Sequence, residues 1–341
     1  MKMRTNLLSA LSLGVAASNF LAVAGEKIII AHRGASGYLP EHTLEAVAMA
    51  HAMDADYIEQ DIVLTKDGVP VVLHDIHLDT VSDAAKRFPD RKRNDGRFYA
   101  IDFTLSEIRQ LRVTERFDPK TGQPVYESRF PMWRSSFEIP TFEEELQLIQ
   151  GLNQSTGKET GIYPEIKAPA WHRQQGQDIT RIVLELLARY GYRTKSDKIY
   201  LQCFDFEELK RIRNQLGYRG KLVQLIGEKN SAESPTDYNW LRTREGLSAI
   251  AKVADGIGPA LPQVVTGKVN AEFRFTDLVQ HAHKLKLEVH PYTFRADALP
   301  EYVLSLEELF HLFFLKAGVD GVFTDQSDQG VAFLRSLGQS D

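Results

Sequence analysis

The sequence of 341 residues contains a single cysteine, Cys203. A disulfide within the chain is therefore excluded. After the first 25 residues the sequence also lacks any apolar run that approaches the roughly 20 residues of a transmembrane helix. Charge of one sign is not in large excess, because 41 basic and 46 acidic side chains give a formal net charge of −5. Binding to a nucleic-acid backbone needs clustered Lys and Arg, so no nucleic-acid partner is expected.

The rest of the composition is that of an ordinary globular protein. Hydrophobic residues make up 43% of the chain and charged residues 26%. These values exclude the disordered, collagen-like and coiled-coil classes. At roughly 150 residues per domain the length allows two domains, although a single α/β barrel can be as long.

Residues 1–24 have the pattern of a signal peptide. Lys2 and Arg4 precede the apolar run 7–17, and Ala22-Val23-Ala24 is a small-x-small cleavage site. We expect the mature chain to be residues 25–341. Because Cys203 is far from the cleavage point, we expect no lipid anchor and no stable membrane anchoring. A periplasmic location is predicted, with secretion as the alternative.

Short β-branched runs alternate with longer amphipathic stretches after the signal peptide, which is typical of parallel βα units. Eight such units predict an α/β fold, a (β/α)₈ TIM barrel in one domain. The expected strands are 27–32, 57–64, 161–167, 198–204, 221–226, 255–259, 287–292 and 321–325. The expected helices are 43–53, 142–151, 179–190, 207–216, 243–253, 275–285, 304–317 and 329–337.

A long insertion, about residues 76–140, follows the second predicted strand. The period is lost there, and in residues 87–97 basic side chains alternate with acidic ones. This mixture favours a solvated excursion from the barrel over a nucleic-acid patch. Long βα loops border the active site of a barrel, so the insertion is expected to narrow the entry of substrate.

Acidic residues lie at the carboxyl ends of two predicted strands. Glu59 and Asp61 are two residues apart, so both side chains point to one face. Glu165 and Lys167 repeat this spacing on the next strand. Crowded carboxylates need a shared proton or a cation, and three oxygen donors without sulfur favour calcium or magnesium. The alternative is that Glu59 or Glu165 only forms an ion pair with Lys167 or Arg33.

Two histidines lie beside these acids in the predicted barrel. His32 ends the first strand, and a two-residue hairpin loop at Asp67-Gly68 would place His74 opposite Asp61. A longer loop would shift this register. Two histidines across one site suit general acid–base catalysis, because the ordinary pKa of histidine is about 6.5. Arg33 and Lys167 supply positive charge for an anionic phosphoryl group.

Seven ordered motifs, spread over nearly the whole mature chain, resemble those of the periplasmic glycerophosphodiester phosphodiesterases. They are His32-Arg33-Gly34, Pro40-Glu41-His42-Thr43, Glu59-Gln60-Asp61, Leu73-His74-Asp75, Pro164-Glu165-Ile166-Lys167, Tyr200-Leu201-Gln202-Cys203-Phe204-Asp205 and His290-Pro291-Tyr292-Thr293. The resemblance implies a barrel that hydrolyses deacylated phospholipids to sn-glycerol 3-phosphate and an alcohol.

The resemblance also implies roles for individual residues. His32 and His74 would be proton acceptor and donor. Glu59, Asp61 and Glu165 would hold a divalent cation, calcium in the exported long forms, with magnesium as the alternative. Arg33 and Lys167 would bind the phosphoryl group, and the mouth would be lined by Gln202, Phe204, His290 and Tyr292. His42 departs from the family pattern, in which many members have asparagine, and is expected to be structural or at the rim.

Three other functions are alternatives to a small-molecule phosphodiesterase. A related barrel phospholipase that acts on intact phospholipids must meet a membrane, but the sequence lacks an exposed aromatic or basic amphipathic stretch. An exported solute-binding protein would need two α/β lobes and a mid-chain linker, which are not visible. A barrel that has lost activity and serves as an adhesin would not need every candidate catalytic residue to be present.

Overall fold

A computed structural model of the chain describes residues 27–228 and 234–338. The predicted signal peptide therefore lies outside the described residues. Within the described ranges, no helix combines the length and the apolar character needed to cross a membrane.

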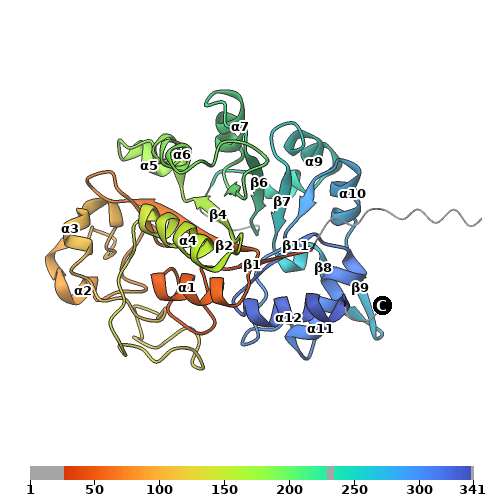
Figure 1. The fold of residues 1–341 in the computed structure, drawn as a ribbon, viewed down its shortest axis with the longest axis horizontal. Helices are drawn as coiled ribbons and strands as arrows, with labels where there is room; N and C mark the ends of the chain where they lie inside the picture. Colours follow the sequence, from red (N-terminus) through yellow and green to blue (C-terminus); the bar gives the residue numbers. More distant parts are fainter. Residues whose placement is uncertain (1–26, 229–233, 339–341) are drawn as a thin grey trace, which may run out of the picture.

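Eight parallel strands surround the centre of the molecule in the order β10-β7-β6-β5-β4-β2-β1-β11 (Figure 1). The barrel is nearly closed between its two end strands, where the Asp320 amide donates to the Val289 carbonyl at 3.0 Å. The predicted TIM-barrel fold is confirmed. Its strands are β1 (Ile28–Ala31), β2 (Tyr57–Leu64), β4 (Gly161–Ile166), β5 (Tyr200–Cys203), β6 (Lys221–Ile226), β7 (Gly256–Pro259), β10 (Glu288–Val289) and β11 (Gly321–Thr324).

Helices pack around the strands, and side-chain caps define where several of them begin. Thr43 caps α1, and Thr141 forms a capping box with Glu144 at the start of α4. The buried faces of these helices join the strands in one large apolar core. The helices around the barrel are α1 (Leu44–Ala52), α4 (Phe142–Thr156), α5 (Pro169–Gln174), α6 (Ile179–Arg189), α7 (Phe206–Asn214), α8 (Tyr238–Leu241), α9 (Arg244–Ile250), α10 (Leu278–Lys284), α11 (Leu306–His311), the π-helix η4 (Leu312–Ala317) and α12 (Ser327–Leu337); the 3₁₀ helix η3 (Leu261–Gln263) follows β7.

Aromatic side chains fill the interior of the barrel beneath the carboxyl ends of the strands. The rings of Tyr163 and Tyr200 stack with their centroids 5.0 Å apart, and Phe323 meets Tyr163 edge-on at 4.9 Å. Tyr57 completes this group, and all four side chains are buried. We call these four rings the aromatic floor, because the functional groups described below lie above them.

The segment between β3 (Pro70–Val72) and α4 lies at one side of the barrel in Figure 1. It forms four short helices and packs its own apolar cluster, which includes Phe98, Phe103 and Phe137, against Val63 of β2. The expectation of a solvated excursion was therefore incomplete. The backbone of this segment is irregular, so its buried apolar residues show no helical or strand periodicity in the sequence. Its helices are α2 (Ala84–Arg87), η1 (Pro89–Arg91), η2 (Ala100–Asp102) and α3 (Leu105–Ile108).

The hairpin between β2 and β3 forms as expected, but its predicted register was wrong by one residue. Leu64 pairs with Pro70, not with Val71, because the turn has three residues and ends at Gly68 with φ of 77°. The Leu73 amide thus donates to the Asp61 carbonyl. His74 follows this pair and is not opposite Asp61.

A second antiparallel hairpin follows β7 and was not expected from the sequence. It consists of β8 (Val265–Val269) and β9 (Glu272–Phe275). The expected helix 275–285 consequently begins later, at Leu278 of α10. Most of the hairpin's side chains are exposed, so buried periodicity gave no signal for it.

Candidate active site

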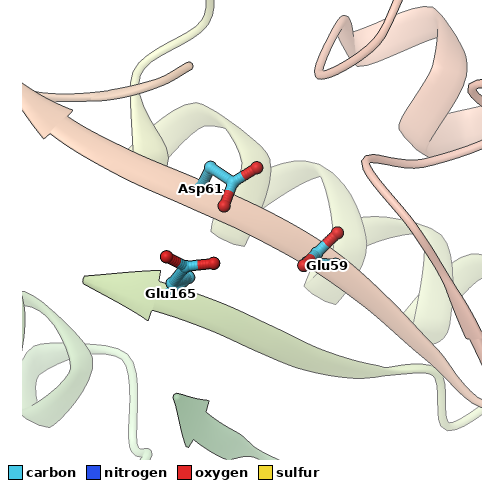
Figure 2. A group of neighbouring side chains, drawn as sticks. All are labelled: Glu59, Asp61 and Glu165. Carbon is cyan, nitrogen blue, oxygen red and sulfur yellow. The ribbon is translucent and has the colours of Figure 1, made fainter. Parts of the chain in front are cut away.

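Three carboxylates from two neighbouring strands meet at the carboxyl end of the barrel. Glu59 and Asp61 lie on one face of β2, and the parallel register sets Asp61 beside Glu165 of β4 (Figure 2). One oxygen from each carboxylate lies within 4.8 Å of the others, and all three residues are buried. The predicted triad is thus brought together as a group that could hold a metal ion.

The three acids have unequal environments. Burial, and then the charge of Asp61, raise the pKa of Glu59 to about 8. Burial also opposes ionisation of Asp61, but Lys167, His74 and His42 hold the pKa of Asp61 well below its ordinary value. Without a cation, one proton therefore stays on the cluster near neutral pH.

Ion pairs account for part of the cluster, as the alternative interpretation of the sequence expected. Lys167 Nζ lies 2.8 Å from Glu165 Oε1 and 3.7 Å from Asp61 Oδ1. Among the described residues, however, no group donates a hydrogen bond to the buried Asp61 Oδ1. Hard divalent cations prefer carboxylate oxygens to sulfur as ligands, so the three acids fit such an ion.

His42 holds the triad from behind. Its Nε2 lies 2.8 Å from Asp61 Oδ2, and its side chain is buried. This residue was expected to be structural or at the rim. The contact assigns it a definite position behind the predicted metal ligand Asp61.

His32 follows β1 and turns its two ring nitrogens to different partners. Nδ1 lies 2.6 Å from Asp325 Oδ1, and Nε2 lies 3.7 Å from Glu59 Oε2. Burial, and then the charge of Arg33, lower the pKa of His32 to about 3. His32 is therefore neutral near pH 7, and Nε2 can accept a proton when Nδ1–H donates to Asp325.

His74 lies nearer the rim and has the same kind of partner. Its Nδ1 lies 2.7 Å from Asp75 Oδ1, and 32% of its side chain is exposed. Burial of the ring, and then the charges of Arg33 and Lys167, lower the pKa of His74 to about 4. The two histidines thus share a cavity of about 350 Å³ with the acidic triad and with Arg33.

Arg33 adds a positive charge to this cavity. Its backbone has φ of 59°, and its amide donates to Glu59 Oε2 at 3.0 Å. The guanidinium donates from Nη1 to Glu41, whereas the buried Nε donates to no group of the described chain. This Nε lies 3.6 Å from Asp61 Oδ2. Phe204 and Tyr292 also line the cavity.

The structure places two of the predicted mouth residues elsewhere. Gln202 lies behind the triad and donates from Nε2 to Glu59 Oε1 at 3.0 Å, so it does not line the cavity. His290 lies deeper still, where its Nδ1 is 2.8 Å from the Tyr163 hydroxyl. Its position at the mouth was wrong, because β10 ends at Val289 and the ring packs among the tyrosines of the aromatic floor.

Several charged residues of the site were missed by the sequence analysis. Asp325 directly follows the last strand, and this position was itself a signal for a site residue. Arg116 and Arg129 come from the insertion, where no periodicity indicates which side chains turn inward. Glu41, in the motif Pro40-Glu41-His42-Thr43, accepts hydrogen bonds from both Arg33 and Arg116.

Residues 32–329, nearly the whole barrel, match the glycerophosphoryl diester phosphodiesterase family. The chain belongs to this family. The family resemblance stated from the motifs is thereby confirmed, as is the enzyme class, a glycerophosphodiester phosphodiesterase.

Known members of the glycerophosphoryl diester phosphodiesterase family are similar over almost the full chain. A glycerophosphodiester phosphodiesterase of Haemophilus influenzae is 47% identical over 99% of this chain and 100% of its own length. The enzyme of the same name from Treponema pallidum is 42% identical, over 94% and 95% of the two chains.

Solved structures of other proteins share the fold. A glycerophosphoryl diester phosphodiesterase of Silicibacter pomeroyi superposes with a TM-score of 0.68 at 25% identity, over 92% of this chain and 94% of its own. A phosphodiesterase of Oleispira antarctica, solved in complex with the product sn-glycerol-3-phosphate, gives 0.59 at 19% identity, over 90% and 96%.

Proposed function

We propose that this enzyme hydrolyses glycerophosphodiesters to sn-glycerol 3-phosphate and an alcohol by general acid–base catalysis with His32 and His74. The observation that carries the proposal is the shared cavity, in which both imidazoles flank the carboxylate triad and Arg33. The product bound in the Oleispira antarctica structure is the one that this reaction would release.

A divalent cation at Glu59, Asp61 and Glu165 is part of the proposal. Calcium is proposed over magnesium because the chain resembles the exported long forms of the family. When bound, such an ion would supply Lewis-acid polarisation of a phosphoryl oxygen.

His32 is proposed as the base because its Nε2 faces the cavity and its lowered pKa keeps it unprotonated. It would remove the proton of the glycerol 2-hydroxyl, whose oxygen then attacks phosphorus. His74 would donate a proton to the oxygen of the departing alcohol. The charge of a bound phosphodiester raises the pKa of a nearby imidazole, which favours the protonated form of His74 that this step needs.

The first step would leave a cyclic glycerophosphate, which water opens while the two histidines exchange roles. Arg33 and Lys167 would stabilise negative charge on the phosphoryl oxygens. Direct attack by water on the diester is the alternative route.

A substrate that lacks the glycerol 2-hydroxyl distinguishes the two routes. Because this hydroxyl is the nucleophile of the cyclic route, the 2-deoxyglycerol analogue of glycerophosphocholine is expected to be cleaved at less than about a hundredth of the normal rate. Release of choline from both compounds is the measurement. Cleavage of the analogue at the normal rate would establish direct attack by water.

Release of sn-glycerol 3-phosphate from glycerophosphocholine tests the proposed function itself. The purified enzyme is expected to turn over with added calcium and to lose activity when a chelator removes the ion. Magnesium is expected to restore less activity than calcium. Absence of turnover with either ion would contradict the proposed reaction, whereas activity that survives chelation would contradict the metal.

The location of the enzyme is also a proposal. The charged, apolar and small-x-small regions of residues 1–24 support export to the periplasm with the mature chain 25–341, and secretion is the alternative. N-terminal sequencing of the exported protein checks the cleavage point; retention of Met1 would contradict it.

A further inference from the structure

Two arginines of the insertion reach back into the active site. Arg129 is almost completely buried there, with 4% of its side chain exposed, and Arg116 is 16% exposed. Together with Tyr126 they line a second cavity of about 160 Å³, which is also lined by His32 and His74. The insertion therefore forms a wall of the site, and its contacts with the histidines can be traced atom by atom.

On the rim side, Arg116 holds the partner of His74. Asp75 uses Oδ1 for His74 Nδ1 and Oδ2 for Arg116 Nη1, both at 2.7 Å. The Thr80 hydroxyl also donates to Oδ2. Arg116 is fixed in turn by Glu41, which accepts from Nε at 3.0 Å and from Nη2 at 2.6 Å.

On the inner side, Arg129 contacts Asp325, the partner of His32, just as Arg116 contacts the partner of His74. Asp325 uses Oδ1 for His32 Nδ1 and Oδ2 for Arg129 Nη2, both at 2.6 Å. Arg295 Nε also donates to Oδ2, at 2.9 Å. Arg129 is itself fixed by a bidentate contact with Asp297.

The orientation of Arg129 is further restricted by stacking and by the backbone. Its guanidinium lies 3.7 Å from the centroid of the Tyr126 ring, and its Nη1 donates to the Ser36 carbonyl. A planar guanidinium held at this many points fixes the carboxylate that it contacts. That carboxylate in turn selects the histidine tautomer with the proton on Nδ1, which leaves Nε2 for the substrate.

We infer that Arg116 and Arg129 are positioning residues for His74 and His32, each acting through the aspartate that orients its imidazole. The insertion thus completes the catalytic geometry and is more than a cover over the entry. This inference rests on the proposed roles of the two histidines, with His32 as base and His74 as acid.

The test compares R116A and R129A on two diesters of glycerol 3-phosphate. Glycerophosphocholine has an alkyl alcohol that needs a proton to depart, whereas the p-nitrophenyl ester releases an anion that does not. Single-turnover release of the alcohol reports the first step alone, and we expect R116A to lower that rate by about 10- to 100-fold on the first ester and by less than about threefold on the second. R129A is expected to lower kcat similarly on both, because the base acts before either group departs.

R93A is the matched control for both variants. Arg93 lies in the same insertion, contacts Asp102 in bidentate fashion at 2.7 and 2.8 Å, and lies 4.1 Å from the centroid of Tyr99. It lines neither cavity of the active site. We expect its kcat and KM on both esters to equal those of the wild type, and thermal unfolding compares the folding of the three variants.

Double variants show whether each arginine acts through its aspartate. Adding R116A to D75N, or R129A to D325N, should lower kcat by less than about a further threefold. R116K and R129K keep the charge but lose the planar fork, so each should show the kcat loss of its alanine variant. These lysine variants carry the test if an alanine variant does not fold.

The outcomes separate this inference from the proposed function. If the wild type and R93A release no glycerol 3-phosphate, the proposed function fails. If they are active, the inference is overturned by any of three results: kcat values of R116A and R129A equal to that of R93A, losses that appear only in KM, or full additivity with the aspartate variants. Equal losses of R116A on the two esters would overturn the role of Arg116 in proton donation.

Discussion

Replacing His32 by asparagine is expected to lower kcat on glycerophosphocholine by about 10²- to 10⁴-fold, the usual contribution of a general base. The asparagine amide can still donate to Asp325 Oδ1, as His32 Nδ1 does at 2.6 Å. The variant therefore keeps the contact that holds this position but has no ring nitrogen to accept a proton. Steady-state kinetics with saturating calcium measure the effect.

H311A is the control for this variant. His311 is exposed at the end of α11 and does not line the cavity, so its removal should leave kcat unchanged. Thermal unfolding and calcium binding of H32N should stay close to those of the wild type. Wild-type turnover by H32N would contradict the proposed role of His32 as the general base.

Replacing Glu59 by glutamine is expected to weaken calcium binding by more than about tenfold, because one of three charged ligands is lost. The pH dependence should change as well. Since the pKa of Glu59 is raised to about 8 in the metal-free protein, binding at pH 7 must release about one proton. Wild-type affinity should therefore increase with pH and level off above about pH 8, and E59Q should lose this dependence. Calorimetry in buffers of different ionisation enthalpy measures the released proton.

The same substitution is expected to stabilise the metal-free protein. The unfolded chain loses the Glu59 proton near pH 4.5, whereas the folded chain keeps it up to about pH 8. The unfolded state thus binds fewer protons between these values, and the wild-type free energy of unfolding decreases as pH rises through this window. E59Q removes this loss, so its melting temperature should exceed that of the wild type at pH 7 to 8 and approach it near pH 4.5.

E145Q is the matched control for the Glu59 prediction. Glu145 of α4 is also fully buried, and burial raises its pKa well above the ordinary value, but it does not line the active-site cavity. Its replacement should leave calcium affinity and proton release unchanged. If E145Q weakened calcium binding as much as E59Q, loss of a buried carboxyl group in general, and not coordination by the triad, would explain the result.

The fold was predictable because buried parallel strands leave continuous apolar runs in the sequence. The strand Ile28–Ala31 is an example, since all four of its residues are apolar and it lies within the predicted range 27–32. The exposed β8–β9 hairpin has no such pattern, and the β2–β3 register depended on one additional turn residue. Local sequence does not distinguish a two-residue turn from a three-residue turn when both contain Asp67-Gly68.

The candidate site was predictable where neighbouring strands carry it. Spacing by two on β2 and β4 was enough to bring Glu59, Asp61 and Glu165 together. Arg129 and Asp325, in contrast, are 196 residues apart in the sequence and meet only because the insertion folds back over the first and last strands. His290 follows the short strand β10, and its ring packs against Tyr163 and Tyr200 inside the barrel, which its motif alone did not indicate.

The aromatic floor restricts how substrate enters the site and how products leave it. Tyr163, Tyr200 and Phe323 are packed ring against ring and are buried, so among the described residues these rings fill the barrel axis beneath the triad. Substrate and both products are therefore expected to enter and leave at the carboxyl end of the barrel. The alcohol and glycerol 3-phosphate leave by the path along which the next diester arrives, so accumulated product and fresh substrate compete for the same passage.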